Sequence, residues 1–247
     1  MEALQGNHTP IPAFPTWMVA SRFEGPEVEA LNQRILTRCY RKRIADPNGI
    51  YRSNAAGCWH SDDHILKYLE EDGQLLGQMF FQSFNKLLTQ FGAAKGGSAK
   101  LQLTAWAMMM THGGYSTIHT HPNCLFSGVY YVAAGPEKPA KTMATGAHVK
   151  PGSIEFMDMR GARDIQLPGL VLTPQMRFAP KNGLMLVFPS NLPHFVHPVE
   201  GEGDRLSIAC NAKLLEYTPP APTPPAANDN AEEPKKAPAQ RKSKRAK

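Results

Sequence analysis

The sequence predicts a mainly β protein with N-terminal helices, built as a β-sandwich or jelly roll that the helices buttress. Two observations carry this prediction. Before residue 100 the apolar residues recur at helical spacing, and after it short β-rich runs alternate with turns rich in Gly, Pro and Asn. The hydrophobic content of 42% and the charged content of 19% are those of an ordinary globular protein.

Two main helices are predicted in the first hundred residues. The first opens at Gly25-Pro26 with acids in its first turn and closes in a basic run, which complements the helix dipole. The second runs from Leu75 to Phe91 and follows a short amphipathic segment over 65–69. His60 and His64 lie four residues apart, and we interpret them as surface histidines because no carboxylate or cysteine at ligand spacing joins them.

From Lys100 onward the pattern is that of short strands. We expect strands over 101–110, 126–132, 153–157, 184–188 and 205–211. We therefore divide the chain into a helical support region over 1–99 and a β core over 100–217, which together form one domain. The segment 218–247 is rich in Pro and has no apolar anchor, so we expect a disordered tail.

Charge and cysteine content exclude several classes of protein. The tail carries +4 of the net charge of +6, so the body is close to neutral and offers no basic face for a nucleic acid. We expect at most weak contact of the basic tail with anionic partners. No apolar run approaches the length of a membrane span, and the N-terminus does not resemble a signal peptide. Four sparse cysteines form no disulfide framework, which predicts a cytoplasmic protein.

Histidines supply a candidate metal site. His119 and His121 are separated by a single residue at the end of a β-rich stretch, so in an extended chain both side chains reach the same face. His194 follows a buried strand and a turn about seventy residues later. Neutral imidazoles are metal ligands. A lone H-x-H also fits one buried and one surface histidine, so His194 is the observation that favours a metal.

Arg205 supplies a candidate anion site. It lies eleven residues after His194 in an otherwise apolar strand, with Ser207 and Asn211 on its own face. An arginine beside a hydroxyl is a typical bidentate clamp for a carboxylate, and burying it without an anion is costly. A half-exposed edge strand would alternate in the same way, so strand parity alone leaves the direction of the side chain open.

These stretches resemble the Fe(II)/2-oxoglutarate dioxygenases. The S-G-V-Y-Y-V strand after the first histidines and the segment P-H-F-V-H-P…D-R-L-S-I resemble the prolyl-hydroxylase branch. From about Trp17 to Asn211 the chain is still more similar to an uncharacterised bacterial group of 2-oxoglutarate/Fe(II) oxygenases. The resemblance implies a double-stranded β-helix, a jelly-roll or cupin-like core, and an oxidoreductase that uses Fe(II), 2-oxoglutarate and O2.

The resemblance also implies roles for five residues. His119 matches the first iron ligand and His194 the distal one. Arg205 with Ser207 matches the clamp for the far carboxylate of 2-oxoglutarate, and Tyr131 matches a tyrosine that helps to hold it. The implied reaction hydroxylates a small-molecule or peptide substrate, which the sequence does not identify, while 2-oxoglutarate is decarboxylated to succinate.

The third iron ligand departs from the usual pattern. His121 stands where an Asp or Glu usually completes the triad, and we assign it as the third ligand. Two alternatives stay open, namely Asp158 as the missing carboxylate, or His121 as the first ligand with Asn123 two residues on. Met159 replaces the usual Pro of that block and weakens a role for Asp158 or Arg160.

Two other functions compete with the dioxygenase. One is a cupin-like protein with three metal-binding histidines that acts without 2-oxoglutarate, as a dioxygenase or isomerase. The other is a non-catalytic ligand-binding β-domain. Arg205 favours the dioxygenase over the cupin-like protein, which has no need of an anion clamp, and the histidines favour both metal proteins over the third class.

Overall fold

The computed structural model describes residues 14–91, 97–142, 148–160, 165–167, 170–172 and 174–219. The predicted fold class, mainly β with N-terminal helices, is confirmed. The elements follow the chain as β1 (Val19–Arg22), α1 (Pro26–Ala45), β2 (Ala55–His60), α2 (Ile65–Tyr68), α3 (Glu70–Gln90), β3 (Ser98–His119), β4 (Phe126–Ala133), β5 (Lys141–Thr142), β6 (His148–Val149), β7 (Ile154–Met157), β8 (Ile165–Leu167), β9 (Leu170–Leu172), β10 (Gln175–Phe178), β11 (Leu184–Pro189), β12 (His194–Val196) and β13 (Arg205–Thr218).

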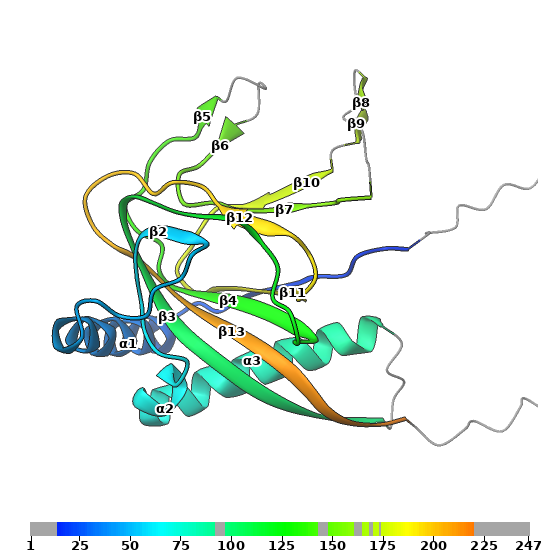
Figure 1. The fold of residues 1–247 in the computed structure, drawn as a ribbon, viewed down its shortest axis with the longest axis horizontal. Helices are drawn as coiled ribbons and strands as arrows, with labels where there is room; N and C mark the ends of the chain where they lie inside the picture. Colours follow the sequence, from blue (N-terminus) through cyan, green and yellow to red (C-terminus); the bar gives the residue numbers. More distant parts are fainter. Residues whose placement is uncertain are drawn as a thin grey trace, which may run out of the picture.

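A single curled antiparallel sheet of nine strands organises the molecule (Figure 1). Its strands are ordered β1-β11-β4-β13-β3-β12-β7-β10, with β2 paired to β3. The long strand β3 connects the two halves. Its first part, from Ser98 to Met110, pairs with β13, and its last residue, His119, pairs with His194 of β12. The sheet therefore folds over itself, and the space between its halves can hold a site.

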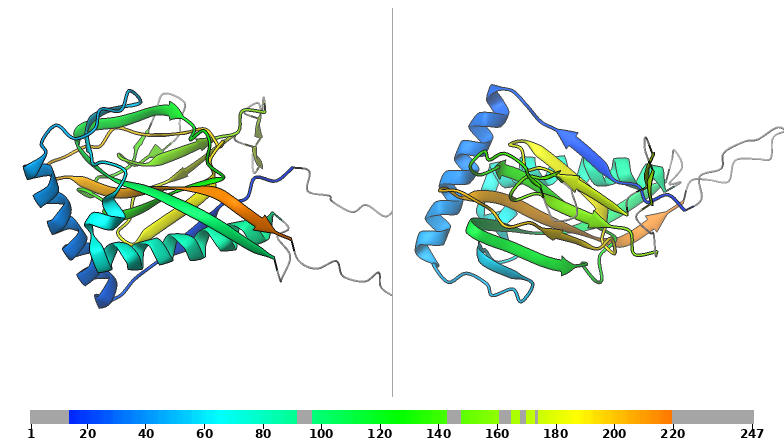
Figure 2. Two further views of the ribbon diagram at one scale, coloured as in Figure 1. Left: turned by 60° about the horizontal axis from the view of Figure 1, so that its bottom comes forward. Right: turned by 90° about the horizontal axis from the view of Figure 1, so that it is seen from above.

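The helices cover the outer face of one half of this sheet. Figure 2 shows α1 and α3 on that face, crossing each other steeply. The buried residues of α3 recur at helical spacing, and the rings of Phe80 and Phe84 stack 5.9 Å apart. Phe84 also stacks on Phe126 of β4, at 6.0 Å. The predicted helices thus pack through the apolar face that the sequence pattern indicated.

Strand β13 separates two apolar cores. Its even-numbered residues, such as Leu206 and Ile208, join the core under the helices. Its odd-numbered residues, beginning with Arg205, face the space between the halves of the sheet. A second core there includes Tyr131 of β4 and Phe156 of β7. Because β13 lies between β3 and β4, it is an internal strand and its polar face is not an exposed edge.

Several boundaries differ from the prediction. The N-terminal third contributes β1 and β2 to the main sheet, and β2 was not predicted at all. Strand β3 continues to His119, beyond the expected end at Met110. The division at residues 99 and 100 stays a prediction. The last described strand ends at Thr218, and the predicted disordered tail lies almost entirely outside the described residues. No described helix has both the length and the apolar character needed to cross a membrane.

Candidate metal centre

Three predicted histidines converge between the halves of the sheet. His119 ends β3, His121 follows two residues later, and His194 begins β12 directly opposite His119. One ligand atom from each ring lies within 4.8 Å of the others. The ring centroids are 4.4 Å apart for His119 and His194, and 5.2 Å apart for His121 and His194. Three imidazoles at this spacing can bind one divalent ion.

Backbone carbonyls fix the orientation of two of these rings. The Nδ1 atom of His119 lies 2.7 Å from the carbonyl oxygen of Thr117, and that of His194 lies 2.9 Å from the carbonyl oxygen of Leu192. A carbonyl only accepts hydrogen bonds, so Nδ1 carries the proton in both rings. The Nε2 lone pair of each is then free for a metal, which is the usual arrangement of a ligating histidine.

The histidines are neutral around pH 7. Burial lowers the pKa of all three rings. For His121 burial and the neighbouring His119 lower the pKa to about 4, and for His194 burial and the same neighbour lower it to about 3. A metal therefore does not have to displace protons from these rings at neutral pH.

The alternative carboxylate ligand is engaged elsewhere. Asp158 accepts hydrogen bonds from Arg160, with Oδ2 2.6 Å from Nη2, and it lies on the partly exposed surface after β7. This guanidinium lowers the pKa of Asp158 to about 2. Within the described part of the chain, no Asp or Glu joins the histidine cluster. Asn123 has a positive φ of 62° in the turn after His121, as its residue type allows.

Arg205 points into the molecule. The residue is 1% exposed, and its Nη1 lies 3.4 Å from the Ser207 hydroxyl and 3.6 Å from the sulfur of Met110. Its Cζ lies 4.8 Å from the centre of the Tyr131 ring. Among the described residues, the buried Nε and Nη2 of Arg205 and the buried hydroxyl of Tyr131 have no hydrogen-bond partner. A buried guanidinium with free donors is the environment that a carboxylate ligand would satisfy.

Two glycines close the space around Arg205. A Cβ on Gly135 would come 3.2 Å from the Cβ of Arg205, and one on Gly152 would come 3.2 Å from its Cδ. Both glycines have positive φ values, of 80° and 71°, which residues with a Cβ seldom adopt. The chain thus packs its backbone directly against the arginine and holds it in place.

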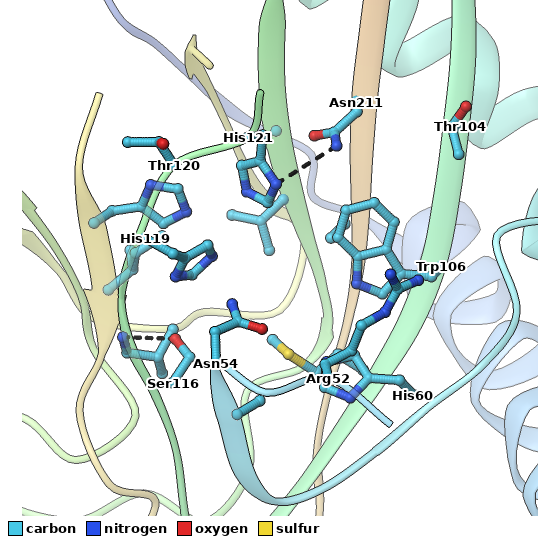
Figure 3. A pocket seen from close by; sticks show the side chains of 18 of the residues that line it. Arg52, Asn54, His60, Thr104, Trp106, Ser116, His119, Thr120, His121 and Asn211 are labelled. Atoms are coloured by element: carbon cyan, nitrogen blue, oxygen red, sulfur yellow. Dashed lines mark hydrogen bonds between the residues drawn. The ribbon is translucent and has the colours of Figure 1, made fainter. Parts of the chain in front are cut away.

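One cavity of about 410 Å³ connects the three histidines with Arg205. Its lining includes the three histidines and Arg205. The opposite wall contains Arg52, Asn54 and Trp106 (Figure 3), and the Trp106 ring reaches the histidines, with its centroid 5.9 Å from that of His121. The guanidinium of Arg52 lies over the Trp106 ring, 5.6 Å from its centre, and donates to Asp63 at 2.5 Å.

The sequence did not predict the opposite wall of the cavity, which we call the polar wall, and the prediction for one histidine was wrong. His60 is buried at the end of β2 and lines the cavity, whereas His64 is exposed. We expected both at the surface because no carboxylate or cysteine at ligand spacing joins them, but β2 pairs with β3 and turns His60 inward. The pairing of β2 with β3 also brings Arg52 and Trp106 together, and no local sequence pattern predicts this pairing.

Residues 104–211 match the family described as "Putative 2OG-Fe(II) oxygenase". This range runs from the first half of β3 into β13, and it contains the three histidines, Tyr131, Arg205 and Ser207. No curated protein matches the sequence.

Three solved structures share the fold. A prolyl-4-hydroxylase from Pseudomonas putida has a TM-score of 0.51 and 16% identity, covering 81% of this chain and 94% of its own. A prolyl hydroxylase from Trichoplax adhaerens, solved with a peptide fragment of hypoxia inducible factor, has a TM-score of 0.51 and 12% identity, covering 79% and 83%. SnoK, an α-ketoglutarate-dependent carbocyclase from nogalamycin biosynthesis, has a TM-score of 0.54 and 9% identity, covering 83% and 82%. These similarities confirm the predicted jelly-roll core.

Proposed function

We propose that this protein, a 2OG-Fe(II) oxygenase by the family of its residues 104–211, hydroxylates a substrate C–H group as 2-oxoglutarate is decarboxylated to succinate. The family uses Fe(II), 2-oxoglutarate and O2. In the balanced reaction the C–H group, 2-oxoglutarate and O2 give the alcohol, succinate and CO2. The substrate itself, a small molecule or a peptide, stays unidentified.

The residues of the cavity fit these groups. His119, His121 and His194 would hold the iron through Nε2, because their rings converge and are neutral. Bound iron activates O2 and gives 2-oxoglutarate a second point of attachment. Three imidazoles leave the ion with its full positive charge, which favours binding of a dianion such as 2-oxoglutarate.

The observation that carries the proposal is the buried Arg205, which lines the same cavity as the histidines and has two donors without a partner among the described residues. Its two unpartnered donors and the Tyr131 hydroxyl are suited to a carboxylate, and Ser207 lies beside them. Burial raises the pKa of Tyr131, so its hydroxyl stays protonated and can donate to an anion. A three-histidine protein that does not bind a dicarboxylate has no use for such a group.

The opposite wall supports a polar substrate. Arg52 and Asn54 precede β2, and Trp106 lies on β3. Together they offer hydrogen-bond donors beside an aromatic face. The buried Nε of Arg52 has no partner among the described residues. We propose that the substrate lies against this wall, with its reacting carbon toward the histidines, and that the wall excludes water from the reaction.

The test is an anaerobic titration of the protein with Fe(II) and then with 2-oxoglutarate. We expect a weak charge-transfer band in the visible range, which forms only when the ligand chelates the metal, and succinate after oxygen is admitted. Bound iron without this band would favour a cupin-like metal protein that acts without 2-oxoglutarate. Folded protein that binds neither would favour a non-catalytic ligand-binding domain.

The cellular setting stays a prediction. All four cysteines are free, and none of them is in a disulfide, which supports the expected cytoplasmic location. We further propose that the basic tail makes at most weak contact with anionic partners, as its composition indicates.

A further inference from the structure

One of the three histidines is oriented differently from the others. The Nδ1 atoms of His119 and His194 each face a backbone carbonyl two residues earlier in the chain. The Nδ1 atom of His121 faces a side chain instead, the amide of Asn211 on β13, at 3.5 Å (Figure 3). The partner of this ring nitrogen is therefore ninety positions away in the sequence.

The Asn211 amide is itself held from its far side. The hydroxyl of Ser127 on β4 lies 2.8 Å from the amide oxygen of Asn211, and the two residues are directly opposite each other in the β4–β13 pair. Ser127 is 1% exposed, so its hydroxyl is shielded from solvent. A chain of three groups thus runs from the hydroxyl through the amide to the imidazole.

The orientation of the Asn211 amide decides whether the Nε2 atom of His121 can bind a metal. If the amide NH2 faces His121, it donates to Nδ1, and the ring proton must then lie on Nε2 and block that atom. If the amide is turned by half a turn about its Cβ–Cγ bond, its oxygen accepts from the Nδ1–H of His121. Its NH2 then donates to the Ser127 hydroxyl, which accepts as readily as it donates.

Only the second orientation leaves Nε2 free, as in His119 and His194. We propose that Asn211, supported by Ser127, is the positioning residue of His121 and takes the place of the backbone carbonyl that the other two ligands use. This inference rests on the proposed function, because it assumes a metal on the three histidines. It gives the third imidazole the outer partner that a metal ligand normally has.

The test measures metal affinity and not turnover, because Asn211 also lines the cavity and could contact a substrate. Purified full-length protein is titrated anaerobically with Co(II), in competition with a chelator, and the visible d–d spectrum of the bound ion is recorded. Asn211→Leu keeps the approximate size but removes the acceptor, and removing such an outer partner typically lowers affinity about 10- to 100-fold. We expect that loss, with a changed d–d spectrum.

Two further variants separate this role from a purely structural one. Asn211→Asp can only accept from Nδ1–H, so we expect affinity at or above that of wild type. Ser127→Ala leaves the Asn211 amide free to rotate, and we expect a smaller loss than for Asn211→Leu. Thr104→Val is the matched control, because Thr104 is opposite Asn211 on β3 and lines the cavity without a hydrogen bond to the histidines. It should leave Co(II) affinity unchanged.

The outcomes are distinguishable from failure of the proposed function. If wild type does not bind Co(II) or Fe(II), the metal site itself is wrong. If wild type binds and Asn211→Leu binds equally well with the same spectrum, Asn211 does not position His121, while the metal site stands. If Asn211→Leu does not fold, Asn211→Asp decides the question, because weakened binding in that variant overturns the inference.

Discussion

The guanidinium of Arg205 lies over the ring of Tyr131, with its Cζ 4.8 Å from the ring centre, and both side chains are buried. The aromatic face stabilises the cation but does not use its N–H donors. Two of the donors stay free among the described residues, and so does the Tyr131 hydroxyl beside them. These unpartnered groups are the basis of the proposal that the pair binds a carboxylate.

The first prediction concerns Arg205. Arg205→Lys keeps the charge but loses the planar fork, so the affinity for 2-oxoglutarate should fall about ten- to hundredfold, equivalent to roughly 1.5–3 kcal/mol. Arg205→Ala should cost more, because the carboxylate would be buried without a partner. The measurement is anaerobic 2-oxoglutarate binding to each protein loaded with Fe(II). Equal affinities with intact metal content would remove Arg205 from the site.

The second prediction concerns the metal ligands. Replacing His119, His121 or His194 by Ala should each lower the bound Fe(II) sharply while the far-UV circular dichroism stays that of a folded protein. Asp158→Ala is the control, since its carboxylate is paired with Arg160 and not with the cluster. The measurement is metal content after anaerobic loading and gel filtration. Full metal in His121→Ala together with loss in Asp158→Ala would mean that the third ligand is the carboxylate.

The histidine cluster and the arginine could be found from the sequence because local rules are enough for them. His119 and His121 are separated by one residue, so in an extended chain their side chains point to the same face of the sheet. The apolar strands around His194 and Arg205 imply that these two residues are buried. Strand parity could not decide whether Arg205 points inward. That depends on β13 lying between β3 and β4, which is a long-range pairing.

The polar wall could not be found because it depends on contacts between distant segments. Arg52 stands before β2, a strand whose sequence carries no clear alternating pattern, and it meets Trp106 only after β2 pairs with β3. His60 was assigned to the surface for the same reason. Such pairings are decided by the whole sheet, and intrinsic strand preferences predict them poorly.

The third prediction concerns the thiols. Cys39 and Cys210 are fully buried, and burial raises the pKa of both, that of Cys39 to about 12, so very little thiolate forms at pH 8. We expect iodoacetamide to modify Cys124, which is partly exposed, before either of them. Peptide mass spectrometry over time gives the rates, and denatured protein serves as the control. Early labelling of Cys39 would contradict the packing of α1 on the sheet.

The fourth prediction concerns the tail. Because its composition cannot bury enough apolar surface to offset the entropy of ordering, removing residues 220–247 should leave the melting temperature and any turnover unchanged. The truncation begins after Pro219 because Thr218 is still paired with Ser98. A melting temperature several degrees lower in the truncated protein would mean that the tail docks on the folded body.

The last prediction concerns the backbone beside the arginine. Gly152→Ala places a methyl group 3.2 Å from the Cδ of Arg205, so the guanidinium must shift, and 2-oxoglutarate affinity should fall several-fold. Any residue with a Cβ is also strained at φ of 71°, by about 1–2 kcal/mol, and this strain must be separated from the contact.

Gly113→Ala supplies the matched comparison. Gly113 has a similar φ of 77°, but a Cβ there meets nothing within 4 Å. Both variants should therefore lose comparable stability in urea unfolding, whereas only Gly152→Ala should bind 2-oxoglutarate more weakly. Weakened binding in both variants would trace the effect to general destabilisation, and unchanged binding in Gly152→Ala would mean that the position of Arg205 does not depend on this close contact.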